Sequence, residues 1–179
     1  MPMRNIYSVT CIQIFSAMAK YLILFCCLFS FAANGQQIKA YKANDIIQRA
    51  SSRDTLYIIN FWATWCAPCV GELSEFNTLE KRYKNKPVKV ILVSLDFKED
   101  YNASKLEMFI ARKRLTPEVV WLADTDPNVF IPQIDKSWQG SIPATVMVYP
   151  QKNYRQFIEG TITAGKIGRM VDGLSLIHI

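Results

Sequence analysis

The stretch "NFWATWCAPCVGEL", residues 60–73, carries two cysteines separated by two residues. It overlaps the run "LYIINFWA", residues 56–63, whose near-continuous apolar character is that of a parallel strand covered on both faces. From about Cys66, apolar residues recur every three or four positions as far as Tyr83, which is the period of a helix. The sequence therefore predicts a buried strand leading directly into a helix, with Cys66 at the junction.

On both sides of this unit, strand and helix patterns alternate. Residues 38–54 read as a short segment followed by an amphipathic helix, with Ile46, Ile47 and Ala50 facing inward. Two more buried strands are predicted at 88–97 and 118–124, a helix at 102–114 between them, and a hairpin from 144–150 and 154–160. A helix can start at Pro127 but cannot run far past Pro132, and a last helix follows Thr163. This order predicts an α/β fold with a central mixed sheet flanked by helices.

The N-terminal residues 1–35 have the pattern of a signal peptide. Residues 21–33 form an apolar run of 13 residues, preceded by Lys20 and followed by small residues. A membrane-spanning helix needs about 20 apolar residues. We therefore expect export to the periplasm, with Met18 as an alternative start. The competing interpretation is an uncleaved N-terminal segment that anchors the protein to the membrane.

The C-terminal residues 174–179, "LSLIHI", match what a transposase mosaic-end sequencing adapter encodes in one reading frame. We expect the native sequence to stop near Gly173 and the folded domain to cover residues 36–173. His178, the only histidine, lies in this tail, and we assign it no chemistry. The other cysteines, Cys11, Cys26 and Cys27, lie in the N-terminal segment, so Cys66 and Cys69 are the two in the domain.

The position of Cys66 suits redox chemistry. Free N–H groups and the positive end of the helix dipole favour a thiolate there, and the thiolate is the form that attacks a disulfide. Pro68 falls in the first helical turn, where its missing N–H costs little. The spacing lets Cys69 resolve a mixed disulfide formed at Cys66. The sequence predicts a redox couple with Cys66 as nucleophile.

Other uses of a cysteine pair fit less well. A zinc site needs four ligands, and the domain offers no second cysteine pair or histidines. Haem attachment needs a histidine directly after the second cysteine, where this chain has Val70. A purely structural disulfide around two residues would constrain the unfolded chain little. We therefore predict a redox-active disulfide with no metal and no organic cofactor.

The amino-acid composition and net charge indicate which kinds of molecule this protein can bind. Half of the residues are hydrophobic and 20% are charged, as in a globular protein. The net charge of +6 is a mild excess spread along the chain, so no nucleic-acid partner is expected. We expect a monomer that meets protein thiols and disulfides.

Together with "SIPAT", residues 141–145, the cysteine motif and the element order resemble the thioredoxin fold over roughly residues 40–173. More narrowly, they resemble the exported TlpA/ResA-like thiol-disulfide oxidoreductases. The resemblance implies that Pro143 is cis and packs against the disulfide, and that Ile142 pairs by its backbone with the substrate. We expect Trp65, Ala67 and Pro68 to complete the substrate-binding surface, with Trp65 at the rim and Trp62 inside.

Two positions separate this chain from the thioredoxins themselves. Thioredoxins carry a buried Asp where this chain has Asn60, which cannot titrate. The TlpA/ResA group often has a Glu at the position of Glu72. One hypothesis is that Glu72 assists proton movement around Cys69. The alternative is a Glu that merely complements the helix dipole from the first turn.

The direction of electron flow follows from what lies between the cysteines. Ala67 and Pro68 include no histidine to stabilise a thiolate, which favours a reductase over an oxidase or isomerase. The resemblance implies a membrane thiol carrier as electron donor and cytochrome c maturation as one candidate process. A non-catalytic binding module on the same fold is the alternative of another class. A peroxidase is disfavoured because Ala63 stands where peroxiredoxin-like sites use threonine.

Overall fold

The computed structural model describes residues 38–99 and 101–174. The predicted signal peptide, residues 1–35, and residues 175–179 of the predicted adapter-encoded tail lie outside these ranges. Leu174, the first residue of that tail, is the C-cap of the last helix. No helix in the described ranges is both long enough and apolar enough to cross a membrane.

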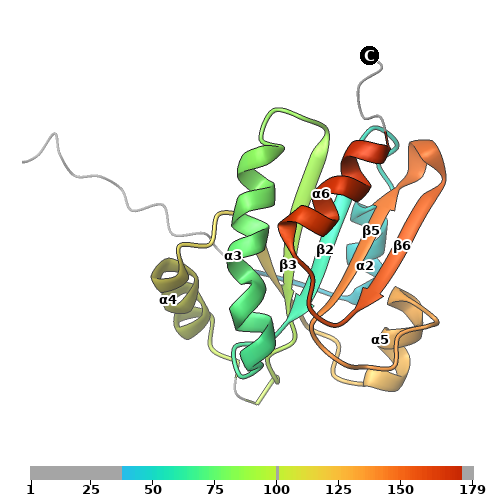
Figure 1. The fold of residues 1–179 in the computed structure, drawn as a ribbon. Coiled ribbons are helices and arrows are strands. Elements are labelled where there is room, and N and C mark those ends of the chain that lie inside the picture. Colours follow the sequence, from blue (N-terminus) through green and yellow to red (C-terminus); the bar gives the residue numbers. More distant parts are fainter. Residues whose placement is uncertain (1–37, 100, 175–179) are drawn as a thin grey trace, which may run out of the picture. The chain divides into compact units, whose positions relative to one another are not determined.

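Within the described residues, six strands form one sheet with the order β1-β4-β3-β2-β5-β6 (Figure 1). The strands are β1 Lys39–Tyr41, β2 Leu56–Trp62, β3 Val88–Ser94, β4 Glu118–Leu122, β5 Ala144–Tyr149 and β6 Tyr154–Glu159. The helices are α2 Ala43–Arg49, α3 Ala67–Arg82, α4 Ala103–Lys113, α5 Pro127–Ile134 and α6 Ala164–Gly173, with a short 3-10 turn, Pro150–Lys152, between β5 and β6. The chain thus has the mixed α/β sheet that the sequence predicted.

Strand direction decides which segments meet at the edge of the sheet. Strands β1, β4, β3 and β2 run parallel, whereas β5 is antiparallel to β2 and to β6. The pairing of β2 with β5 places Phe61 opposite Ala144. The residues that follow β2 and those that precede β5 therefore lie at the same edge.

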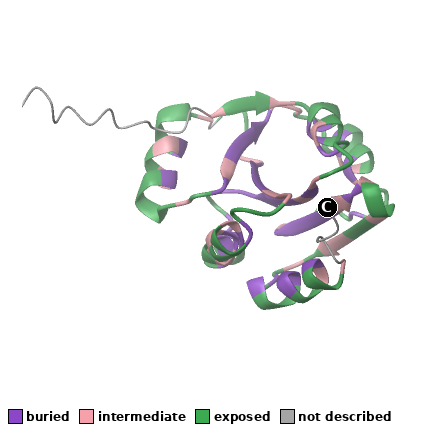
Figure 2. Ribbon diagram, turned by 90° about the horizontal axis from the view of Figure 1, so that it is seen from above, coloured by how far each residue is buried: buried purple, intermediate pink, exposed green. Residues whose placement is uncertain are grey.

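The helices cover both faces of this sheet (Figure 1). Helices α3, α4 and α6 pack on one face, in a core cluster that includes Phe76, Leu106 and Ile167. Helices α2 and α5 pack on the other face, around Ile46 and Phe130. Figure 2 shows the central strands largely buried, whereas the helices are exposed on their outer sides. Since both faces are covered, the central strands are mostly apolar, as their sequences indicated, with buried polar exceptions that include Asn60 and Thr145.

Polar side chains mark the starts of three helices. The side chains of Asn102, Asp126 and Thr163 accept hydrogen bonds from backbone N–H groups in the first turns of α4, α5 and α6. Helix α3 differs, because its N-cap residue is Cys66. A redox-capable sulfur thus occupies the position that a capping oxygen fills in the other three.

Most element predictions are confirmed, with two corrections. Strand β1 was missed, because three residues are too few to show a period; it pairs in parallel with β4 at the sheet edge. The inward position predicted for Ile47 is wrong: it is 36% exposed, because α2 turns Ala43 and Ile46 toward the sheet. Helix α5 continues two residues past Pro132, to Ile134.

Candidate active site

The cysteine pair lies where β2 ends and α3 begins, and its sulfurs are joined by a disulfide bond of 2.01 Å. The Sγ of Cys66 also accepts a hydrogen bond of 3.3 Å from the backbone N–H of Cys69. The first turn of α3 holds no acidic residue, so no side-chain charge there offsets the positive end of the helix dipole. This environment favours negative charge on Cys66 when the pair is reduced.

The two sulfurs differ in access. Cys66 is 6% exposed, whereas Cys69 is fully buried. A partner can therefore reach the pair only through Cys66. The roles of Cys66 as attacking and Cys69 as resolving sulfur stay predictions, and they require this asymmetry of access.

The segment before β5 lies against Cys66. The peptide bond between Ile142 and Pro143 is cis, as the sequence resemblance implied. The carbonyl oxygen of Ile142 lies 3.8 Å from the Sγ of Cys66, and Pro143 is buried. The antiparallel pairing of β2 and β5 is what brings these two motifs together from 76 residues apart in the chain.

The residues around Cys66 form an exposed, partly aromatic surface. Trp65 is 56% exposed, and its ring stacks on that of Phe97 at a centroid distance of 5.3 Å. Ala67 and Pro68 are exposed as well. Trp62 is fully buried and packs near Phe109, so the predicted difference between the two tryptophans is confirmed.

Glu72 is a buried carboxylate held by two donors. Its Oε1 accepts from the side-chain amide of Asn60 at 2.9 Å, and its Oε2 accepts from the backbone N–H of Ile162 at 2.8 Å. Burial raises the pKa of Glu72 above its usual value, although both hydrogen bonds oppose the rise and the nearby charge of Glu75 adds to it. Glu72 follows Cys69 by three residues on α3, so both lie on one face of that helix.

The interpretation of Glu72 as a first-turn residue that complements the helix dipole is wrong. Helix α3 begins at Ala67 and has no acidic residue in its first turn. Glu72 is the sixth residue of the helix and points into the protein, where it is 6% exposed. Its environment is set by Asn60 and Ile162 instead.

Asn60 links Glu72 to the strand that follows the cis proline. Its Nδ2 lies 2.9 Å from Glu72 Oε1 and 3.1 Å from the hydroxyl oxygen of Thr145, its direct partner across the β2–β5 pairing. The Oδ1 of Asn60 is buried and has no hydrogen-bond partner among the described residues. The amide nitrogen thus donates to Glu72, Thr145 and, at 3.4 Å, the carbonyl of Ala144, while the amide oxygen accepts no hydrogen bond from the described residues.

Sequence reasoning missed several residues of this site. Thr145 and Ile162 contact the Asn60–Glu72 pair, and Glu75 accepts a hydrogen bond of 2.7 Å from the N–H of Ala164. A threonine in the otherwise apolar run "ATVMV" was a usable signal, since a polar side chain on a buried strand needs a partner. Nothing in the sequence indicated that Phe97 would stack on Trp65.

In the described residues, no group of three or more His, Cys, Asp or Glu side chains is placed to hold a metal ion. That no metal or organic cofactor is needed stays a prediction.

The raised pKa of Glu72 predicts a pH-dependent contribution to stability. The folded protein holds this proton more tightly than the unfolded chain, so the contribution is present at low pH and is lost as the pH rises through the folded-state pKa. We expect the difference in free energy of unfolding, oxidised wild type minus Glu72→Gln, to fall as the pH rises above 4.5. Urea titrations across pH measure it, with the exposed Glu99→Gln correcting for a lost charge. A difference that stays flat or rises with pH would contradict this.

Comparison with known proteins agrees with this geometry. Residues 27–156 match the AhpC/TSA family. The curated relatives include proteins named thiol-disulfide oxidoreductase ResA. The protein from Oceanobacillus iheyensis is 31% identical over 110 residues, 62% of this chain and 52% of the relative. The protein from Geobacillus kaustophilus is 29% identical over 117 residues, 65% of this chain and 61% of the relative. The chain thus spans between half and two thirds of these relatives.

Solved structures show the same fold. A thioredoxin-related protein from Neisseria meningitidis serogroup B matches with a TM-score of 0.58 and 24% identity, covering 68% of this chain and 86% of the other. StoA from Bacillus subtilis matches with a TM-score of 0.52 and 21% identity, covering 67% and 84%. The family match over residues 27–156 and the ResA relatives show that the chain belongs to the AhpC/TSA family, as a ResA/TlpA-like member of the thioredoxin superfamily.

Proposed function

We propose that this protein is a thiol-disulfide oxidoreductase that reduces disulfide bonds in other proteins. The observation that carries the proposal is the Cys66–Cys69 pair at the start of α3, with Cys66 accessible, Cys69 buried, and the cis Ile142–Pro143 bond against the accessible sulfur. The names of the ResA relatives support the class of reaction.

The reaction needs only the two sulfurs and a path for protons. In the reduced protein, the Cys66 thiolate attacks a substrate disulfide, forms a mixed disulfide, and releases one substrate thiolate. The Cys69 sulfur, deprotonated, then attacks Cys66 Sγ and releases the second substrate thiolate. The products are a reduced substrate and the Cys66–Cys69 disulfide, so two electrons pass from protein to substrate.

The reductase direction rests on the residues between the cysteines. Ala67 and Pro68 offer no side-chain donor that would stabilise the thiolate of Cys66 and make the disulfide strongly oxidising. A reductase must be re-reduced by another dithiol. We propose that a membrane thiol carrier outside the cytoplasm supplies these electrons, and that an exported monomer uses them, with cytochrome c maturation as one candidate process.

Glu72 is proposed to handle the proton of Cys69. Cys69 is fully buried, so water cannot readily take its proton when it must attack. Glu72 is a buried carboxylate on the same face of α3, and its raised pKa makes it a better base than an exposed glutamate. Asn60 and the N–H of Ile162 hold it in place.

The exchange reaction predicts a trapped intermediate. Without the resolving sulfur, Cys69→Ala should accumulate mixed disulfides between Cys66 and substrate proteins, visible as thiol-sensitive bands on non-reducing gels. The matched variant Cys66→Ala should accumulate none. If both variants behave alike and Cys66→Ala keeps the cellular role of the protein, the chain is a non-catalytic binding module instead.

The direction of electron flow can be read from the reduction potential of the pair. We expect equilibration with glutathione to give a value nearer thioredoxin, about −270 mV, than the strong oxidant DsbA, about −120 mV. A potential near the oxidant's value would overturn the reductase assignment but not the exchange chemistry.

The role of Glu72 predicts a change in pH dependence. In wild type, the rate of disulfide reduction should rise with pH as the Glu72 carboxyl loses its proton. Glu72→Gln should lose this inflection and slow by about 100-fold, the lower range for a missing general base. Glu107→Gln is the control, because it removes a carboxylate on α4 that neither hydrogen-bonds to Glu72 nor contributes to its raised pKa. An unchanged pH profile in Glu72→Gln would exclude the proton role.

A further inference from the structure

We infer that a groove beside Cys66 selects substrate polypeptides that carry an aromatic side chain and a neighbouring lysine or arginine close to the reacting cysteine. The inference deepens the proposed function and rests on it. We call this hollow the aromatic groove. It is lined by Trp65, Leu95, Asp96, Phe97, Lys98, Glu99, Trp121, Leu122, Asp124, Thr125, Pro127, Phe130, Ile131, Trp138, Gly140 and Ile142.

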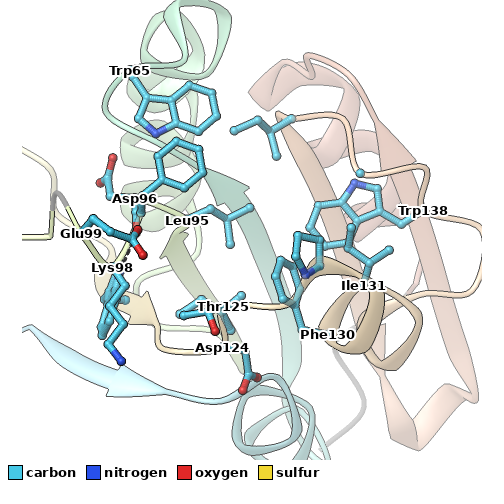
Figure 3. Close-up of a pocket in the computed structure, with 16 residues that line it drawn as sticks. Trp65, Leu95, Asp96, Lys98, Glu99, Asp124, Thr125, Phe130, Ile131 and Trp138 are labelled. Atoms are coloured by element: carbon cyan, nitrogen blue, oxygen red, sulfur yellow. Dashed lines mark hydrogen bonds between the residues drawn. The ribbon is translucent and has the colours of Figure 1, made fainter.

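The aromatic groove begins at the reacting sulfur. Trp65 precedes Cys66 in the chain, and the carbonyl oxygen of Ile142 lies 3.8 Å from its Sγ. From there the groove extends past the ends of β3 and β4 toward Asp124 (Figure 3). The carboxyl ends of parallel strands are where α/β sheets commonly bind their ligands. A polypeptide with its cysteine at Cys66 can therefore place a neighbouring side chain in the groove.

The size of the groove fits one large side chain. Its volume is about 220 Å³. An apolar protein cavity of about 150 Å³ can hold a benzene ring, whereas pockets for whole small-molecule ligands are usually about 300–1,000 Å³. The aromatic groove thus has room for an aromatic ring but is small for an organic cofactor.

The wall formed by Trp138 and Ile131 is apolar, and Trp138 is held in place by its contacts. Figure 3 shows Trp65 at one end of the groove and Trp138 with Ile131 on the opposite wall from Leu95. The indole N–H of Trp138 donates to the carbonyl of Ser141 at 2.9 Å, and its ring contacts those of Phe61 and Phe130. Because these contacts already fix the wall, binding a ring there loses little side-chain freedom.

The Trp65–Phe97 stack adds an exposed apolar surface. The two rings lie nearly parallel at 5.3 Å, yet they remain 56% and 57% exposed. Few large hydrophobic side chains among the described residues are this exposed, and these two lie together in the lining of the groove. A partner that covers them gains apolar burial that the protein alone does not provide.

Charge indicates the second feature of the substrate. The groove lining has three carboxylates, Asp96, Glu99 and Asp124, against one cation, Lys98. None of the three carboxylates forms an ion pair with another described residue. This local negative charge stands out in a chain with a net charge of +6. A lysine or arginine beside the substrate's aromatic residue would complement it.

A second hollow, which shares Trp65 and Asp96 with the aromatic groove, has an excess of positive charge in its lining. It is lined by Thr64, Trp65, Asp96, Tyr101, Asn102, Lys105, Leu106, Phe109 and Arg112, and its volume is about 240 Å³. Lys105 and Arg112 would suit an acidic substrate segment there. The charge preference of the substrate therefore tells which of the two hollows is used.

The test compares peptides that differ in one residue. Each is a cysteine peptide joined to glutathione by a disulfide, with phenylalanine near the cysteine followed by lysine; matched peptides have serine for phenylalanine or glutamate for lysine. Reduction by the reduced protein should be about tenfold faster for the phenylalanine peptide than for the serine peptide, as for other small apolar pockets. It should also be faster with lysine than with glutamate, and this second ratio should shrink at high salt.

Variants assign these preferences to the groove. Phe97→Ser should reduce the phenylalanine-to-serine ratio, whereas Met108→Ser, at a position 64% exposed on α4 and outside the groove, should keep it. Glu99→Gln should weaken the lysine preference, with Glu107→Gln, which does not line the groove, as its control.

Equal rates for the phenylalanine and serine peptides would overturn the aromatic preference. A preference for glutamate over lysine would overturn the charge assignment and point to the hollow with Lys105 and Arg112. If the reduced protein reacts with none of the peptides and not with oxidised glutathione, the proposed function fails, and the inference fails with it.

Discussion

The antiparallel pairing of β2 with β5 is the constraint on which the rest of the site depends. A parallel strand in this place would begin at the far edge of the sheet, and the segment before it could not contact the end of β2. Because β5 is antiparallel to β2, Ile142 and Pro143 lie at the edge of the sheet where Cys66 caps α3. The contact between the accessible sulfur and the Ile142–Pro143 segment, where the aromatic groove begins, depends on this one strand direction.

The same pairing also supports the buried polar side chains behind the sulfurs. Asn60 and Thr145 face each other across β2 and β5, and Asn60 holds Glu72 from α3. Glu72 and Glu75 in turn bind the N–H groups of Ile162 and Ala164 ahead of α6. Leaving a buried polar group without its partner costs about 1–3 kcal/mol, and more for a charge. These bonds therefore link α3, the central strands and the loop before α6 into a single arrangement.

Much of the fold was readable from local patterns. Long apolar runs, such as 56–63, and long periodic runs, such as that of α3, leave few alternatives because each buries a whole face. The CxxC motif at the strand–helix junction predicted the position of Cys66 and Cys69, and the family resemblance predicted the cis bond before Pro143 and its place beside them. Side-chain partners were not readable in this way. Whether the Glu72 side chain complements the helix dipole or points into the core depends on Asn60 and Ile162, which are distant in sequence. Strand β1 has only three residues, and it is recognisable as a strand only from its pairing with β4.

The unequal burial of the two sulfurs has a consequence for how the protein meets its partners. Cys69 is fully buried, so in the proposed reaction the electron donor and the electron acceptor would both have to react at Cys66. The two partners would then have to visit the same face in turn, and no complex could hold both at once. Turnover would follow a ping-pong scheme, in which each partner competes with the other for the surface around Cys66. Features that attract a substrate to that face would also have to allow the reductant to dock, which limits how specific the face can become.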